Sequence, residues 1–395
     1  MTGEAGSSGA MPSAFGGVFD LQDFYRGFDL DEITPENMQS WPYYRYVSAH
    51  WPDYVQASTA PIPASSNPAE LAAGERFDLN GEFRIGKTYL QSLLDTQVKG
   101  FVVMRDNKIL AEFYDNGFNL GDRNLLQSAA KTFAGVVTHK LVDAGALDLE
   151  AMVGTILAGF EGTTIGESTV QQVLDMQTGA PTLLDFHTEG TPDQEWEIAI
   201  GLQGGAAVGH VEAIRTARKV AEPGTEWNYS DKNTDALALV AEHVSGRPYV
   251  ELLGELFDDF GANDPASIVI TADGTASPCY GISATTRDYA LFHQWIAQRK
   301  APTSYYASAM DTAKDLMGAH QLAAETFPGT TYGSQTYFMT NENVLHSSGS
   351  FGQIGASDMD TGTAVAMNAD WANNAEPKKF EESRARAVAI IKALR

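Results

Sequence analysis

The chain has 395 residues, 43% of them hydrophobic and 19% charged, which is typical of a folded globular protein rather than a disordered one. Its 26 basic and 51 acidic residues give a formal net charge of −25, which excludes nucleic acid and anionic membranes as expected partners. The single cysteine, Cys279, excludes an intrachain disulfide and fits a reducing compartment. With no recognisable signal peptide or membrane span, we expect a cytoplasmic protein.

The first 87 residues show little regular periodicity. Residues 1–18 are rich in Gly, Ser and Ala, whereas residues 19–80 hold many aromatic side chains. So many aromatic residues argue against a freely solvated tail. We therefore predict that residues 1–87 form an N-terminal arm packed on the main body.

Regular elements are predicted from residue 88 onward. TYLQSLLDTQ at 88–97 indicates a helix, and the segment 100–117 reads as a hairpin because two β-rich runs flank the turn residues 105–108. The run 128–148 has apolar residues at helical spacing, and Gly145 stands where a helix often ends. A hairpin followed directly by a helix is therefore expected here.

The middle of the chain favours helices and its end favours strands. Helical periodicity recurs at 168–179, 233–246, 248–261 and 285–298. Strand-like runs then occur at 336–340, 344–349, 351–359 and 363–369, before a basic amphipathic helix at 378–395. We predict an α+β fold with an antiparallel sheet flanked by helices. Residues 88–150 and 290–395 would form the sheet-containing lobe, and residues 151–289 a mainly helical lobe.

Ser128 and Lys131 begin the helix that follows the predicted hairpin. A spacing of three places both side chains on one face of a helical turn. A serine becomes a strong nucleophile when a nearby base removes its proton, and a lysine serves as that base when its pKa is lowered. The alternative is a helix-capping serine followed by a surface lysine.

Tyr229 lies in PGTEWNYSDKN, just before a helix predicted to begin near Asn233. A phenol held at such a loop end could relay a proton in a cleft. The alternative is an aromatic loop anchor, with Asp231 or Asn233 capping the helix.

A third segment, LHSSGSFGQIG, reads as a strand with small residues at its centre. Gly349 would allow the backbone to approach a ligand closely, and the N–H of Ser350 could donate to an oxyanion together with that of Ser128. The alternative is a small-residue strand that crosses under a helix.

The order and spacing of the three segments resemble the β-lactamase and penicillin-binding-protein-like serine hydrolases, especially their class C branch. The corresponding motifs here are Ser128-Ala129-Ala130-Lys131, Tyr229-Ser230-Asp231 and His346-Ser347-Ser348-Gly349-Ser350. Within that family the chain is most similar to the 6-aminohexanoate-dimer hydrolases, amidases that open linear nylon oligomers. This likeness runs from about residue 98 to the end.

The resemblance implies Ser128 as the acylated nucleophile, Lys131 as general base and Tyr229 as acid/base partner, with Ser128 and Ser350 as the oxyanion hole. It also implies substrate contacts from Asp231, Asn233, Cys279, Ser347 and Gly349. Three departures stand out. Asp231 replaces the asparagine of the family's Tyr-x-Asn motif. Ser347 replaces a lysine that helps hold the substrate carboxylate in β-lactam-recognising members, and Cys279 replaces a substrate-binding asparagine of the amidases.

We therefore predict a serine hydrolase that cleaves short linear amides or esters through an acyl-enzyme. A carboxylesterase or acyltransferase of the same fold is the alternative within the enzyme class, and a non-catalytic binding protein is the alternative outside it. No cofactor is expected, and the eight histidines show no metal-ligand spacing. The resemblance implies a possible homodimer.

Overall fold

The computed structural model describes residues 29–115, 117–182, 188–205 and 209–395. Residues 1–28 of the predicted arm lie outside these ranges. The first described elements are η1 (Leu30–Glu32), α2 (Tyr43–Ala49) and α3 (Trp51–Tyr54), followed by strand β1 (Ser58–Ile62). The side chains of Tyr44, Val47 and Trp51 are fully buried, so this part of the arm packs on the body of the protein.

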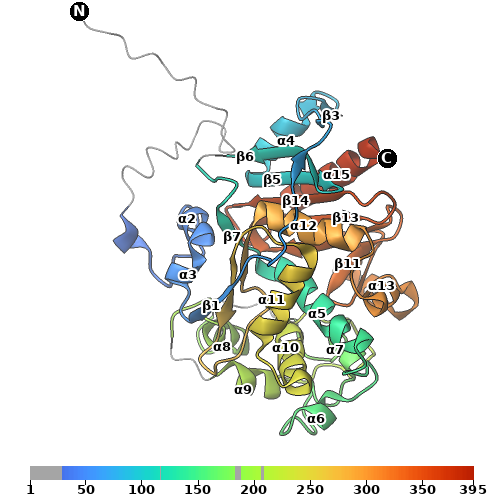
Figure 1. Cartoon of the computed structure of the whole chain (residues 1–395). Coiled ribbons are helices and arrows are strands. Elements are labelled where there is room, and N and C mark those ends of the chain that lie inside the picture. Colours follow the sequence, from blue (N-terminus) through green and yellow to red (C-terminus); the bar gives the residue numbers. More distant parts are fainter. Residues whose placement is uncertain (1–28, 116, 183–187, 206–208) are drawn as a thin grey trace, which may run out of the picture.

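An eight-stranded sheet forms the upper half of the molecule in Figure 1. Its strand order is β10-β11-β12-β13-β14-β5-β6-β2, with antiparallel neighbours except for the parallel pair β2 and β6. The strands are β2 (Ala72–Ala73), β5 (Val98–Arg105), β6 (Lys108–Tyr114), β10 (Thr330–Gly333), β11 (Thr336–Met339), β12 (Val344–Gly349), β13 (Gln353–Asp358) and β14 (Ala364–Ala369). The pairing of β14 with β5 joins the early hairpin to the late strands, as predicted.

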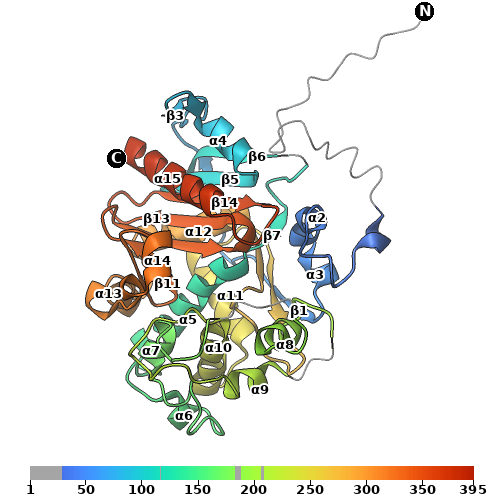
Figure 2. The ribbon, with the colours of Figure 1, turned by 180° about the vertical axis from the view of Figure 1, so that it is seen from behind.

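Helices cover both faces of this sheet, so its central strands are apolar on both sides. Along β5, Phe101 and Val103 pack toward α4 (Tyr89–Asp95) and α15 (Pro377–Leu394), while Val102 and Met104 join the core on the opposite face. Helix α12 (Thr286–Ala297) covers that opposite face. Figures 1 and 2 show α12 and α15 on opposite sides of the strands.

A second, antiparallel sheet has the order β1-β8-β9-β7. Its strands are β1, β7 (Arg123–Leu125), β8 (Ala266–Ile270) and β9 (Ile282–Thr285). Because β1 comes from the arm and β7 leads into the helix that begins near residue 128, this sheet ties the N-terminal segment to the centre of the molecule. A short ribbon, β3 (Glu82–Arg84) with β4 (Lys87–Thr88), precedes α4.

The lower half in Figure 1 is largely helical. Its longer helices are α5 (Lys131–Asp143), α10 (Asp231–Ser245) and α11 (Tyr249–Phe260), and its shorter ones are α6 (Val153–Ile156), α7 (Val170–Leu174), α8 (Pro192–Ala199) and α9 (His210–Arg215). The remaining segments are η2 (Gln127–Ala130), α13 (Thr303–Ala309), η3 (Thr312–Lys314), η4 (Met317–Ala319), α14 (Gln321–Thr326) and η5 (Ser350–Gly352).

The predicted α+β class, with an antiparallel sheet flanked by helices, is confirmed. Helix α5 ends before Gly145, whose φ of 71° is the left-handed conformation expected of a glycine after a helix. Helix α10 begins at Asp231, two residues earlier than predicted. Among the helices of the described ranges, none combines the length and the apolar character that crossing a bilayer requires.

Candidate active site

Ser128 and Lys131 meet where η2 passes into α5. Ser128 is the second residue of the single-turn helix η2, and Lys131 is the first residue of α5. The Lys131 Nζ donates a hydrogen bond to Ser128 Oγ at 2.9 Å. Ser128 is half-buried, whereas Lys131 is almost fully buried. The predicted pairing of these two side chains on one helical turn is therefore present.

Lys131 has three further neighbours. Its Nζ donates to the carbonyl oxygen of Cys279 at 2.7 Å, lies 2.7 Å from Asp231 Oδ1 and sits 4.9 Å from the centre of the Tyr229 ring. Burial acts to lower the pKa of Lys131, but the charge of Asp231 outweighs it and raises that pKa above its ordinary value. The side chain is therefore a charged ammonium, which corrects the predicted lowered pKa. The sequence did not indicate that the Asp231 carboxylate would lie beside Lys131.

Tyr229 lies on the loop that enters α10. Burial raises the pKa of its phenol, while the nearby Lys131 charge and hydrogen bonds with Ser128 and Lys131 oppose that shift; the net pKa is raised. Its ring packs against Trp227 and Tyr332 with centroids 5.9 and 6.1 Å away. Tyr229 is thus a neutral phenol held against Ser128 and Lys131.

Gly349 brings the end of β12 against η2. A Cβ at this position would lie 2.4 Å from the Leu126 carbonyl oxygen and 3.0 Å from the Ala129 nitrogen. Only a glycine leaves room for this approach, which places Ser350, the first residue of η5, in the same cavity wall as Ser128. Ser128 is the second residue of η2 and Ser350 the first of η5, positions at the start of a helix where backbone N–H groups lack an acceptor within the helix. Two such donors beside one cavity can stabilise an oxyanion.

These side chains face a cavity of about 380 Å³. Its wall is formed by five segments of the chain: the arm, the η2 turn, the α8 region, the start of α10 and the segment after β14. The lining residues are Gln39, Ser40, Gln127, Ser128, Glu197, Leu202, Gln203, Tyr229, Asp231, Tyr280, Ser350, Phe351, Ala372, Asn373 and Asn374. A cavity of this size suits a small molecule.

Glu197 is a cavity residue that the sequence did not single out. Burial and the nearby Asp231 raise the pKa of its carboxyl to about 8. Gln39 of the arm donates to Glu197 Oε2 at 3.4 Å and to the Leu202 carbonyl at 3.0 Å. Gln39 and Glu197 are 158 positions apart in the sequence, so no local pattern could have indicated their contact.

The cavity wall does not include four of the predicted substrate-contacting residues: Asn233, Cys279, Ser347 and Gly349. Asn233 accepts a hydrogen bond from Thr178 at 2.8 Å within the core. Ser347 Oγ lies 2.6 Å from the Tyr289 hydroxyl and 2.8 Å from His293 Nε2, so it packs toward α12. A lysine side chain at position 347 would therefore lie on the buried α12 side of the strand and not in the cavity.

Cys279 serves the site through its backbone rather than its thiol. Burial, with the charges of Asp235 and Asp231, holds the pKa of this thiol well above its usual range, so it stays protonated. Asp235 Oδ1 accepts from the Cys279 N–H at 2.8 Å, and Asp235 Oδ2 accepts from Ser277 Oγ at 2.7 Å. This buried carboxyl fixes the segment whose carbonyl receives Lys131.

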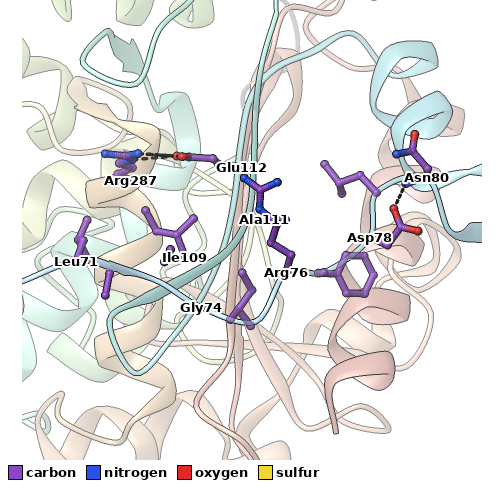
Figure 3. A pocket seen from close by; sticks show the side chains of 14 residues that line it. Leu71, Gly74, Arg76, Asp78, Asn80, Ile109, Ala111, Glu112 and Arg287 are labelled. Atoms are coloured by element: carbon purple, nitrogen blue, oxygen red, sulfur yellow. Dashed lines mark hydrogen bonds and ion pairs between the residues drawn. The ribbon is translucent and has the colours of Figure 1, made fainter.

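A larger cavity of about 590 Å³ lies at the outer edge of the sheet (Figure 3). It is bounded by β6 and the segment 71–80, and Arg287 forms an ion pair with Glu112 at 2.8 Å beside it. None of the side chains that meet around Ser128 lines it. Among the residues that the structure describes, no group of three or more His, Cys, Asp or Glu side chains is placed to hold a metal ion.

Fold and site together define a serine-hydrolase scaffold of the β-lactamase type, and residues 100–392 match the family model described as "Beta-lactamase". The chain belongs to this family. It is 30% identical over 270 residues to the 6-aminohexanoate-dimer hydrolase of Paenarthrobacter ureafaciens, covering 67% of this chain and 68% of that protein.

The solved structures that share the fold include the following two. One is a Bacillus anthracis protein provisionally named a 6-aminohexanoate-dimer hydrolase, with a TM-score of 0.77, 19% identity and coverage of 92% of this chain and 98% of that one. The other is EstCE1, described as a hydrolase with promiscuous acyltransferase activity, with a TM-score of 0.61, 15% identity and coverage of 76% and 96%. The predicted resemblance is confirmed at the level of the family.

Proposed function

We propose that the protein hydrolyses short linear amides, and esters of similar size, through an acyl-enzyme on Ser128. The observation that carries this proposal is the contact of Ser128 with Lys131 and Tyr229 in the wall of a cavity that Ser350 also lines. The similarity to a 6-aminohexanoate-dimer hydrolase supports a short amide as the substrate.

In the first step Ser128 Oγ attacks the carbonyl carbon, and the backbone N–H groups of Ser128 and Ser350 stabilise the oxyanion. Before this attack the Lys131 ammonium loses one proton, and the Asp231 carboxylate, 2.7 Å away, can receive it. The neutral Lys131 amine then accepts the proton of the Ser128 hydroxyl. Tyr229 passes a proton to the leaving nitrogen or oxygen. Water then attacks the acyl-enzyme, and the same groups return Ser128 to its starting state.

The residues that line the cavity also support a proposal about the charge of the substrate. Among the described residues that line it, Glu197 and Asp231 are acidic and none is Lys or Arg. A carboxylate entering this space would lose its hydration without a cation to replace it. The proposed substrates are therefore neutral at the end that lies near Glu197, because the raised pKa of Glu197 leaves that carboxyl protonated at neutral pH.

A labelling experiment tests the nucleophile. The protein is treated with a fluorophosphonate probe, the labelled peptide is mapped by mass spectrometry, and hydrolysis of a linear aminohexanoate dimer and of p-nitrophenyl butyrate is measured. We expect the label on Ser128, and we expect Ser128→Ala to lose both label and turnover while its melting temperature stays within a few degrees. Ser40→Ala, which alters another serine of the same cavity, should keep both. A label elsewhere, or turnover in Ser128→Ala, would contradict the proposal.

A further inference from the structure

Two residues beside the cavity have a backbone conformation that side chains rarely adopt. Gln127 has φ 51° and Phe351 has φ 61°. Gln127 directly precedes Ser128, and Phe351 directly follows Ser350. Such left-handed positions persist in non-glycine residues when the surrounding structure holds them. The two backbone segments that would bind an oxyanion are therefore both held in strained turns.

One side chain of the N-terminal arm contacts both strained residues. Gln127 Nε2 donates a hydrogen bond to the Tyr44 hydroxyl at 3.0 Å, and the Tyr44 ring stacks on Phe351 with centroids 3.7 Å apart and planes 25° from parallel. Tyr44, Gln127 and Phe351 are all buried. Tyr44 is not part of the cavity wall, so it reaches the site only through these two neighbours.

Tyr44 is itself anchored to the large sheet. Its helix α2 lies beside β7 in both views (Figures 1 and 2). The next residue, Arg45, pairs with Asp370 at 3.1 Å and donates to the Asp115 carbonyl at 3.2 Å. Asp370 also pairs with Lys99 of β5 at 2.7 Å. This buried ion cluster is costly to break, so it fixes α2 and hence Tyr44 relative to the sheet.

We infer that Tyr44 is a positioning residue of the oxyanion site, clamping the Ser128 turn through Gln127 and the Ser350 turn through Phe351. The inference rests on the proposed function, because Tyr44 has this role only if the backbone N–H groups of Ser128 and Ser350 both act in catalysis. A clamp of this kind acts on the tetrahedral transition state more than on substrate binding. It also gives the arm a part in catalysis without contact with substrate.

Tyr44→Phe and Tyr44→Leu separate the two contacts. The first keeps the ring stack and removes the hydroxyl, and the second removes both. We expect kcat for p-nitrophenyl butyrate to fall about tenfold in Tyr44→Phe and about a hundredfold in Tyr44→Leu, with KM nearly unchanged, since losing one oxyanion donor outright costs about 10²- to 10³-fold. Affinity for an alkylboronic acid, which forms a tetrahedral adduct on the serine, should fall in the same proportion.

Tyr43→Phe is the matched control, because this neighbouring phenol on the same helix bonds the exposed Glu32 instead. It should leave kcat and boronic-acid affinity unchanged. If Ser128 carries the fluorophosphonate label while Tyr44→Phe keeps full kcat and affinity, the clamp is refuted and the proposed function stands. A rise in KM with kcat intact would likewise overturn it. Absence of any label on Ser128 would instead overturn the proposed function. Should Tyr44→Leu fail to fold, Tyr44→Phe decides.

Discussion

At the scale of single residues, the charge of Lys131 controls the chemistry open to the site. Its ammonium contacts Ser128, Asp231 and the Cys279 carbonyl, each within 3 Å. Such a group supplies positive charge to a developing oxyanion at once, but it accepts a proton only after losing one. These two roles, cation and base, make different demands on the side chain.

Lys131→Arg distinguishes a base from a cation. Arginine would keep the positive charge beside Asp231, but its guanidinium does not give up a proton at working pH. We expect kcat to fall by about 10²- to 10⁴-fold, the usual contribution of a general base. Steady-state hydrolysis of p-nitrophenyl butyrate measures this. Lys232→Arg is the control, because the Lys232 ammonium lies 5.6 Å from the centre of the Trp196 ring, a cation–π contact that an arginine can also make. A fully active Lys131→Arg enzyme would show that the residue supplies only charge.

Glu197 makes the stability of the protein depend on pH. Burial and Asp231 raise the pKa of Glu197 to about 8 in the folded state, above the ordinary 4.5 of an unfolded chain. The folded state therefore binds the Glu197 proton more tightly than the unfolded state does. The contribution of this group to the free energy of unfolding is greatest below about pH 4.5 and is lost as pH rises through about 8. Glu197→Gln, neutral at every pH, should match the parent at pH 4.5 and exceed its melting temperature at pH 8.5.

Thermal melts at these two pH values make the comparison. Each unit of pKa difference corresponds to about 1.4 kcal/mol, so the gain at pH 8.5 should reach several degrees. Glu195→Gln, a change at an exposed glutamate two residues away, should show no such difference between the two pH values. If Glu197→Gln behaved like Glu195→Gln, the carboxyl would be ionised in the folded protein.

At the scale of elements, the contact between β12 and η2 aligns the two serines of the cavity. Gly349→Ala tests it, because the added Cβ would lie 2.4 Å from the Leu126 carbonyl oxygen although the φ of −135° suits alanine. The strand or the turn must shift. We expect a loss of about 1–3 kcal/mol in unfolding free energy and at least a tenfold fall in kcat.

Urea unfolding and steady-state kinetics measure the two effects of Gly349→Ala. Gly254→Ala on α11 is the control, since a Cβ there meets nothing within 4 Å and alanine favours a helix. That variant should be as active as the parent and equally or more stable. A Gly349→Ala enzyme with unchanged kcat would mean that the spacing of β12 and η2 does not matter for catalysis.

At the scale of the whole molecule, charge should select the substrate. The net charge is −25, and the described residues that line the cavity include no Lys or Arg to pair with an anionic substrate. We expect two anionic substrates, nitrocefin and mono-p-nitrophenyl succinate, to react about a hundred- to a thousandfold more slowly than the neutral p-nitrophenyl butyrate. This corresponds to a loss of transition-state binding of two to three times about 1.4 kcal/mol, each of which is tenfold in rate. The two esters form a matched pair that differs in charge. Equal kcat/KM values for them would show that cavity charge does not govern selection.

From the sequence alone we predicted the family, the early hairpin, the late strands, the main helices and the candidates Ser128, Lys131 and Tyr229, but not the second sheet of β1, β7, β8 and β9. The helices and strands follow from hydrophobic periodicity and from a glycine after a helix, whereas the family and the roles of Ser128, Lys131 and Tyr229 follow from the resemblance of the three motifs. The pairing of the early hairpin with the late strands was also predictable, because apolar strands on both sides of a helical segment need each other for burial.

Only the tertiary structure decided which predicted residues face the cavity. Asn233 and Ser347 stand near the motifs in the chain, yet their side chains bond Thr178, Tyr289 and His293 in the core. Glu197 and Tyr44 carry no motif, yet the fold brings one into the cavity and the other against both of its serine-bearing turns. The charge of Lys131 was decided in the same way. A pKa depends on burial and on every charge within a few ångströms, and those distances exist only in the folded chain.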